Sequence, residues 1–240
     1  MLALLAGACG SGERQALEFD VSNILIEAGT TSNGTVDISG TTVTYAVTVP
    51  DGFSKGDSAP VLLAFPPGDQ TIEGTRNTVD QVYAREALRL GWVVVSPAAP
   101  GGDLFFQGGE DVLPGFVDWI EAWVTPEGGA PHVAGMSNGG LSSFRFAAEN
   151  PDRVLSVIAF PGFARSDSDR DALAELSDVP IQIYIGGNDA PWIDGATATV
   201  DAARAAGVSI HVQTFPGEDH IIMSTYDGRI VFEQLERFRR

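Results

Sequence analysis

The sequence predicts an α/β fold, in which helices cover both faces of a mostly parallel sheet. Continuous apolar runs such as VLLAF at 61–65 and WVVV at 92–95 are typical of strands buried on both faces. The segment 41–50, TTVTYAVTVP, instead alternates apolar and polar residues, as in a strand with one buried face. Segments with helical spacing of apolar residues separate the later runs. Strands that alternate with helices in this way indicate a parallel sheet.

The remaining elements follow in chain order. A stretch rich in Gly, Ser, Thr and Asn over 10–40 is interpreted as a tether followed by a short edge strand or two. Counted from residue 41, the sequence predicts seven strands, and eight with an N-terminal one. The expected strands span 41–49, 61–65, 92–95, 132–134, 154–160, 180–185 and 209–215, and the expected helices span 76–90, 112–124, 138–149, 195–206 and 228–239.

The composition indicates one folded domain. The 240 residues are 44% hydrophobic and 19% charged, which is enough apolar material for a single large core. Asp and Glu number 32 against 14 Lys and Arg, giving a formal net charge of -18. Such a surface repels nucleic acid and anionic membranes, so neither is an expected partner. We expect residues 17–240 to form a single monomeric domain.

Residues 1–16 are interpreted as the remnant of an export signal and a linker. The chain begins MLALLAGACGSG, with a short apolar run, a cysteine and then Gly and Ser. This pattern resembles the end of a bacterial lipoprotein signal, which implies a secreted or cell-envelope protein tethered to the membrane through lipidated Cys9. The alternative is an ordinary chain terminus. No other segment approaches the ~18 apolar residues of a membrane span.

A serine stands between glycines at 135–139, GMSNG, which matches the pattern G-x-S-x-G. The motif follows the expected strand 132–134 and precedes the expected helix 138–149. This strand–turn–helix setting suits a nucleophile on a tight turn, where glycines remove side chains that would collide. The helix N-terminus favours negative charge beside the serine. Ser137 is therefore predicted to be a nucleophile, rather than part of a flexible turn or a helix cap.

One of the three histidines is placed to activate this serine. A serine hydroxyl is a poor nucleophile without a base. His132 begins the strand before the serine, at the wrong end of the sheet, and His211 lies inside the strand 209–215. His220 lies in the loop after that strand, and loops at the carboxyl ends of parallel strands share one edge of the sheet. His220 is the predicted base.

An aspartate near the end of the preceding strand is the predicted third member. The stretch 185–192, IGGNDAPW, follows that strand directly and places Asp189 on the same edge of the sheet. A carboxylate there would orient the imidazole and stabilise its charged form. Asp194, Asp167 and Asp219 are the alternatives.

Two N–H donors are expected to bind the oxyanion formed in acyl transfer. The backbone of Asn138, directly after the nucleophile, is one predicted donor. The other is expected in the loop 66–71, PPGDQT, where Gly68 lets the backbone turn and leaves the amide of Asp69 facing the site. Gln70 is the alternative donor, and a plain proline–glycine turn is the alternative without a function.

These features resemble the α/β-hydrolase superfamily, in particular small secreted esterases of the polyhydroxybutyrate-depolymerase-like and feruloyl-esterase-like groups. The chain order serine, aspartate, histidine is that of the superfamily. The resemblance implies a central sheet of about eight strands with helices on both faces, and no large cap domain. It covers roughly residues 41–240 and rests on GMSNGG at 135–140, GGNDAPW at 186–192 and GEDH at 217–220.

The resemblance implies a serine carboxylic-ester hydrolase that forms an acyl-enzyme and acts on a small or polymeric ester. The predicted substrate contacts are Met136, Trp192, Phe105 and Gln70. No metal or organic cofactor is expected, because the sequence has neither clustered His and Cys ligands nor a phosphate-binding glycine loop. The alternatives are a serine peptidase or thioesterase on the same fold, and a surface lipoprotein that binds without turnover.

Overall fold

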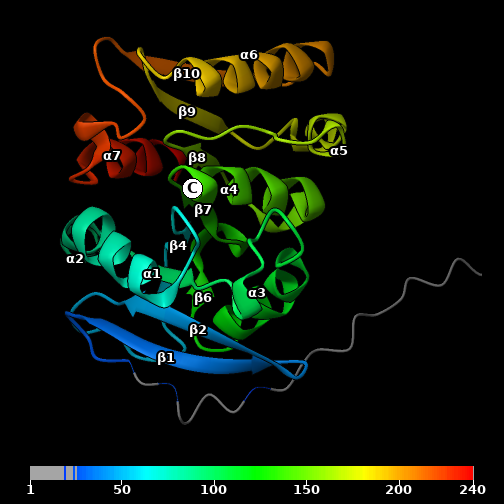
Figure 1. Ribbon diagram of the computed structural model, residues 1–240. Helices are drawn as coiled ribbons and strands as arrows, with labels where there is room; N and C mark the ends of the chain where they lie inside the picture. The colour runs from blue at the N-terminus through cyan, green and yellow to red at the C-terminus, as the bar shows by residue number, and fades with distance from the viewer. Residues whose placement is uncertain (1–18, 20–23, 25, 240) are drawn as a thin grey trace, which may run out of the picture.

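The computed structural model describes residues 19, 24 and 26–239, and one large sheet runs through it (Figure 1). The expected signal remnant over 1–16, with Cys9, lies outside the described residues. The strands of the sheet are β1 (Thr31–Ile38), β2 (Thr41–Thr48), β4 (Val61–Phe65), β5 (Val93–Pro97), β7 (His132–Gly135), β8 (Val157–Ala159), β9 (Ile181–Gly186) and β10 (Ile210–Phe215). Their spatial order is β1-β2-β5-β4-β7-β8-β9-β10.

The predicted strand directions are confirmed. β2 is antiparallel to β1 and β5, and every neighbouring pair from β5 to β10 is parallel. All five residues of β4 and of β5 are buried, as their continuous apolar runs predicted. A separate two-stranded sheet of β3 (Ser58–Ala59) and β6 (Thr125–Pro126) was not predicted, because strands of two residues carry no periodicity.

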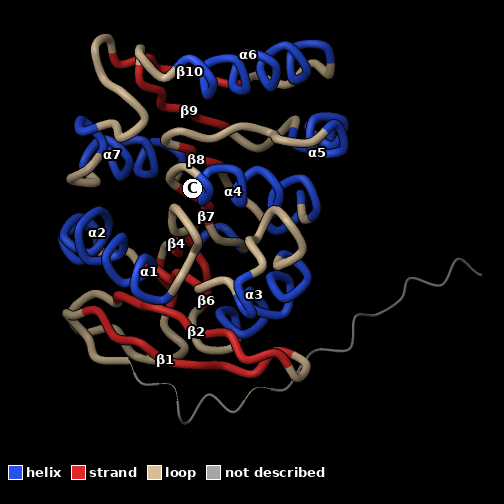
Figure 2. The backbone as a smooth tube through the Cα atoms, in the orientation of Figure 1, coloured by secondary structure: helices blue, strands red, loops and turns tan. Residues whose placement is uncertain are grey.

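Helices cover both faces of the sheet (Figures 1 and 2). They are α1 (Ile72–Thr78), α2 (Ala84–Leu90), α3 (Leu113–Glu121), α4 (Asn138–Glu149), α5 (Asp167–Asp171), α6 (Ala190–Ala205) and α7 (Arg229–Phe238). Alternate side chains of β4 enter two different cores. Leu63 and Phe65 pack in the core with α3, α4 and α6, whereas Leu62 and Ala64 pack in the core with α2 and α7. No helix in the described part of the chain is long and apolar enough to cross a membrane.

Two helices differ from their predicted bounds. The helix expected over 76–90 contains a π-helical turn, Val79–Tyr83, between α1 and α2. The helix expected to start at 195 starts at Ala190, because the proline that follows is compatible with the first turn of a helix. Between β8 and β9 the chain forms only α5 and a short 3₁₀ turn, Ala172–Leu176, so no large cap domain stands over the carboxyl edge of the sheet.

Candidate active site

Ser137 lies at a sharp turn between β7 and α4. Its φ of 57° and ψ of -122° lie in a region that residues with a side chain rarely adopt, and such strain costs about 1–3 kcal/mol. The flanking glycines are sterically required: a Cβ on Gly135 would approach the Gly139 carbonyl oxygen to 2.1 Å, and one on Gly139 would approach Phe65 as closely. The turn therefore holds the hydroxyl clear of its own backbone.

The structure brings Ser137, His220 and Asp189 together. Ser137 Oγ lies 2.8 Å from His220 Nε2, and His220 Nδ1 lies 2.7 Å from Asp189 Oδ2. The ionised carboxylate can only accept, so Nδ1 carries the ring proton and Nε2 accepts from the serine hydroxyl. Asp189 is 9% exposed, whereas the imidazole is half-buried at the surface. This arrangement can draw a proton from the serine.

The other two histidines have partners away from this site. His132 is buried, and its Nδ1 lies 2.7 Å from Ser156 Oγ. His211 Nδ1 lies 2.7 Å from Gln182 Oε1. Both imidazoles therefore form hydrogen bonds away from Ser137, as their positions in the sequence predicted.

Asp189 is the carboxylate that the imidazole contacts, in preference to the three alternatives. Asp167 forms an ion pair with an arginine of its own helix. Asp194 lies one turn further along α6, and Asp219 precedes the histidine; within the described chain, neither side chain hydrogen-bonds to His220. Asp189 has this position because it is the N-cap residue of α6, directly after β9.

Backbone contacts fix the loops that carry the acid and the base. The Asn188 N–H donates to the Glu218 carbonyl at 3.0 Å, and the Gly187 N–H donates to the Phe215 carbonyl at 2.9 Å. A Cβ on Gly186 would approach the Asp219 carbonyl oxygen to 2.1 Å, so the two loops meet with no room for a side chain. The close approach sets the distance between the carboxylate and the imidazole.

The second side of the site is the loop after β4. Gly68, with φ of 60°, lies in its turn, and the Gln70 N–H donates to the Pro67 carbonyl at 3.3 Å. Asn138 Nδ2 donates to the Gly68 carbonyl at 2.9 Å, which joins this loop to the first residue of α4. Among the described residues, the backbone N–H groups of Asn138 and Asp69 have no acceptor. The side chain of Asp69 is exposed.

Two predicted substrate contacts are wrong. Phe105 and Gln70 are both 0% exposed, so neither lines an open site. The ring of Phe105 packs 5.5 Å from that of Phe65 in the core. The amide of Gln70 is used in internal hydrogen bonds and does not reach the site as a donor. The prediction for Phe105 failed because an aromatic pair in a glycine-rich segment can pack in a core as well as line a pocket.

One aromatic ring packs against the half-buried imidazole, and other apolar residues lie close to Ser137 and His220 in the sequence. The Trp192 ring centroid lies 4.7 Å from that of His220, and Met136 precedes Ser137 and is partly exposed. Ile221 and Met223, which the sequence reasoning missed, are 56% and 66% exposed in the loop that carries the histidine. Their position shortly after His220 in the sequence could have identified them as candidates for apolar surface beside the imidazole. They add apolar surface to this loop.

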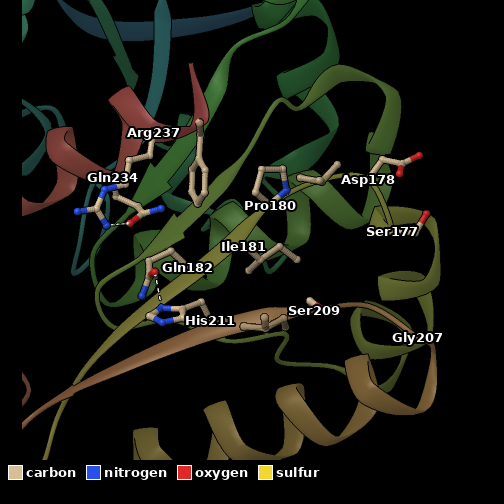
Figure 3. Close-up of a pocket in the computed structure, with 13 residues that line it drawn as sticks. Ser177, Asp178, Pro180, Ile181, Gln182, Gly207, Ser209, His211, Gln234 and Arg237 are labelled. Carbon is tan, nitrogen blue, oxygen red and sulfur yellow. Dashed lines mark hydrogen bonds between the residues drawn. The ribbon is translucent and has the colours of Figure 1, made fainter. Parts of the chain in front are cut away.

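A cavity of about 740 Å³ lies away from this site (Figure 3). Its lining includes Ile181 and Ile210, the first residues of β9 and β10, and thus the opposite edge of the sheet from Ser137. His211 and Gln182 line it and hydrogen-bond to each other. None of the triad side chains contributes to it. The cavity is therefore not part of the candidate active site at the carboxyl edge of the sheet.

A family model described as the dienelactone hydrolase family matches residues 101–233 of the chain. This range, more than half of the sequence, contains Ser137, Asp189 and His220 but not the loop after β4. A comparison with curated proteins gives no match.

Solved structures are similar in fold. A ferulic acid esterase has a TM-score of 0.65 and 18% identity, covering 88% of this chain and 97% of its own. An S-formylglutathione hydrolase from Agrobacterium tumefaciens has a TM-score of 0.65 and 18% identity, covering 87% and 93%. A putative dipeptidyl aminopeptidase IV from Bacteroides ovatus has a TM-score of 0.67 and 14% identity, covering 87% of this chain but 35% of its own. The predicted α/β-hydrolase fold and the resemblance to its esterases are confirmed.

Proposed function

The chain belongs to the dienelactone hydrolase family, and from this premise we propose that it is a serine hydrolase that cleaves carboxylic esters. The observation that supports the proposal is the unbroken pair of contacts, 2.8 Å from Ser137 Oγ to His220 Nε2 and 2.7 Å from His220 Nδ1 to Asp189 Oδ2. A hydroxyl, an imidazole and a buried carboxylate in this order form an activated nucleophile.

In the proposed acylation step, Ser137 Oγ attacks the ester carbonyl carbon while His220 Nε2 accepts the hydroxyl proton. Asp189 holds the ring and stabilises the imidazolium. The backbone N–H groups of Asn138 and Asp69 bind the oxyanion, aided by the N-terminus of α4. The tetrahedral intermediate collapses, the bond to the leaving oxygen breaks, and His220 returns its proton to the departing alcohol.

The deacylation step repeats this chemistry with water. His220 Nε2 accepts a proton from the water as its oxygen attacks the acyl carbon, and the same N–H groups bind the second oxyanion. When this intermediate collapses, the proton returns to Ser137 Oγ and the carboxylic acid leaves. Each proton transfer is assigned to a side chain of this chain, so the proposed mechanism uses no cofactor.

The surroundings of the imidazole favour an ester with an apolar part. Trp192 packs against His220, Met136 directly precedes Ser137, and the exposed Ile221 and Met223 follow His220 in the chain. In the described part of the chain, the segment between β8 and β9 forms no large cap, so bulky or polymeric esters are proposed as substrates beside small ones. The ferulic acid esterase among the similar folds makes esters of aromatic carboxylic acids a class to include.

A fluorophosphonate probe and a substrate panel test the proposal. We expect the probe to label the wild-type protein but not Ser137→Ala, and we expect hydrolysis of p-nitrophenyl esters, methyl ferulate, acetylated xylan or a polyester film. A wild type that is not labelled and hydrolyses none of these would support the alternative, a lipoprotein that binds without turnover.

A peptidase or thioesterase with the same triad is the second candidate. The similar folds include a putative dipeptidyl aminopeptidase IV, of whose length this chain spans 35%, and an S-formylglutathione hydrolase. Activity on p-nitrophenyl esters but none on aminoacyl anilides would exclude the peptidase. Comparison of matched oxygen esters and thioesters distinguishes the thioesterase.

Export and membrane tethering through Cys9 remain a separate proposal, based on the sequence pattern at 1–12. Metabolic labelling with a radioactive fatty acid in a bacterial host tests it. Label should appear in the full-length protein and disappear in Cys9→Ser, and an unlabelled membrane-free protein would contradict the tether.

A further inference from the structure

A buried glutamine lies behind the oxyanion side of the site. Gln70 is 0% exposed, although its side chain is polar. Its backbone φ is 52°, in the left-handed region that residues with a side chain rarely occupy. Both features are unfavourable unless the surrounding contacts hold the residue in place.

Every polar atom of the Gln70 side chain has a partner. Nε2 donates to the Pro66 carbonyl at 3.1 Å and to Ser142 Oγ at 2.8 Å. Oε1 accepts from the Phe105 N–H at 2.9 Å. Ser142 Oγ in turn donates to the Asn138 carbonyl at 3.0 Å. The Gln70 side chain therefore ties its own loop to Ser142 of α4, whose hydroxyl bonds in turn to the carbonyl of the residue that follows Ser137.

Two further hydrogen bonds complete the connection. The Gln70 N–H closes the turn by donating to the Pro67 carbonyl at 3.3 Å, and Asp69 lies inside this turn. Asn138 Nδ2 donates to the Gly68 carbonyl at 2.9 Å. The amide of Asp69 is thus flanked by two residues that are each bound to α4.

We propose that Gln70 is a positioning residue that sets the spacing of the two oxyanion donors, the N–H groups of Asp69 and Asn138. This inference rests on the proposed function. The Gln70 side chain does not contact the oxyanion, because both its N–H groups are used and it is buried. Oxyanion donors must lie about 2.7–3.1 Å from the developing charge, so a small shift of the loop weakens transition-state binding more than substrate binding.

The test replaces the amide and keeps the bulk. Gln70→Met removes all three side-chain hydrogen bonds at nearly constant length. We expect kcat for p-nitrophenyl acetate to fall about 100-fold, as for the loss of one oxyanion donor, with KM changed less than about three-fold. A boronic acid that forms a tetrahedral adduct on Ser137 should lose affinity by the same factor as kcat.

Gln182→Met is the matched control. Gln182 is also a buried glutamine, 2% exposed, and its amide bonds to Ile183 and His211 away from the site. We expect its kcat to stay within about two-fold of the wild type, because a buried hydrogen bond there affects stability and not the oxyanion. Equal losses of kcat in the two variants at equal losses of Tm would overturn the inference, as would wild-type kcat in Gln70→Met.

A milder variant covers the case in which Gln70→Met does not fold. Ser142→Ala removes only the connection to α4, and we expect about ten-fold lower kcat with unchanged KM, the effect of one buried hydrogen bond. Unchanged kcat in Ser142→Ala would overturn the inference. A wild type that hydrolyses no ester and is not labelled at Ser137 would overturn the proposed function as well, whereas an active wild type with unaffected variants overturns this inference alone.

Discussion

The two sides of the candidate site are held together by different kinds of contact. On the acid–base side, backbone bonds such as Asn188 N–H to Glu218 carbonyl, 3.0 Å, join two loops, and the imidazole is half-buried. On the oxyanion side, the fully buried side chain of Gln70 joins a loop to α4. In the proposed mechanism, side chains carry the chemistry on the first side and backbone amides bind the oxyanion on the other.

This difference predicts which substitutions lower the rate of the proposed reaction. Where a side chain reacts, replacing it removes the chemistry, and the backbone around it only needs to hold its position. Where a backbone N–H donates to the oxyanion, we expect the side chain of the residue that carries it to matter less, and the side chain of Asp69 is exposed. We then expect the rate to depend on the side chain that holds the loop in place, here Gln70.

The largest expected effect is on the nucleophile. Ser137→Ala should lower kcat by at least about 10⁴-fold, because binding and oxyanion stabilisation alone leave a small residual rate. Rates with p-nitrophenyl acetate and fluorophosphonate labelling measure it. The free energy of unfolding should change by less than about 1 kcal/mol, since alanine keeps the same strained backbone and the change removes one hydrogen bond to the half-buried imidazole. Activity of Ser137→Ala near that of the wild type would show that Ser137 is not the nucleophile.

The second largest effect on kcat is expected for the carboxylate of Asp189. Asp189→Asn should lower kcat by about 10³–10⁴-fold, because an amide that donates to Nδ1 stabilises the wrong tautomer of His220. Asp194→Asn is the matched control, one turn further along α6 and without a hydrogen bond to the imidazole in the described chain. Its kcat should stay within about two-fold. The opposite ranking of the two variants would assign the role to Asp194.

A smaller effect is expected where the two loops of the acid–base side meet. In Gly186→Ala the new Cβ would lie 2.1 Å from the Asp219 carbonyl oxygen, so the loops must separate and lengthen the contact from Asp189 to His220. We expect kcat to fall about 100-fold, since misplacement by about 1 Å has effects of this size. Steady-state rates and Tm measure it.

Gly74→Ala is the matched control for that variant. A Cβ at Gly74 in α1 meets only Thr71 Oγ1, at an ordinary 3.5 Å. Alanine is the better helix former, so stability should rise by up to about 1 kcal/mol with unchanged kcat. If Gly186→Ala keeps full activity, the backbone contacts between the loops do not set the geometry of the acid–base side.

The same difference explains which parts of the site the sequence revealed. The strands and their mostly parallel direction, the strand–turn–helix around Ser137 and the loops of Asp189 and His220 follow from periodicity and from residue types that few other roles require. The role of Gln70 did not follow, because a buried amide between distant segments leaves no local pattern. Phe105 was misplaced for a related reason: its burial depends on Phe65, 5.5 Å away across the fold.

The smallest expected effect concerns the apolar surface beside His220. Met223→Ser removes the most exposed large hydrophobic side chain among the described residues, 66% exposed. If the acyl chain of the substrate covers it, the change should lower kcat/KM about five-fold for a long p-nitrophenyl ester, the effect of about 1 kcal/mol of lost apolar contact. The acetate ester, which is too short to reach it, should be unaffected. Val212→Ser, 37% exposed on the edge strand β10, is the control and should leave both rates unchanged. Equal rates on the long ester for Met223→Ser and the wild type would place the acyl chain on the oxyanion side instead, away from the loop of His220.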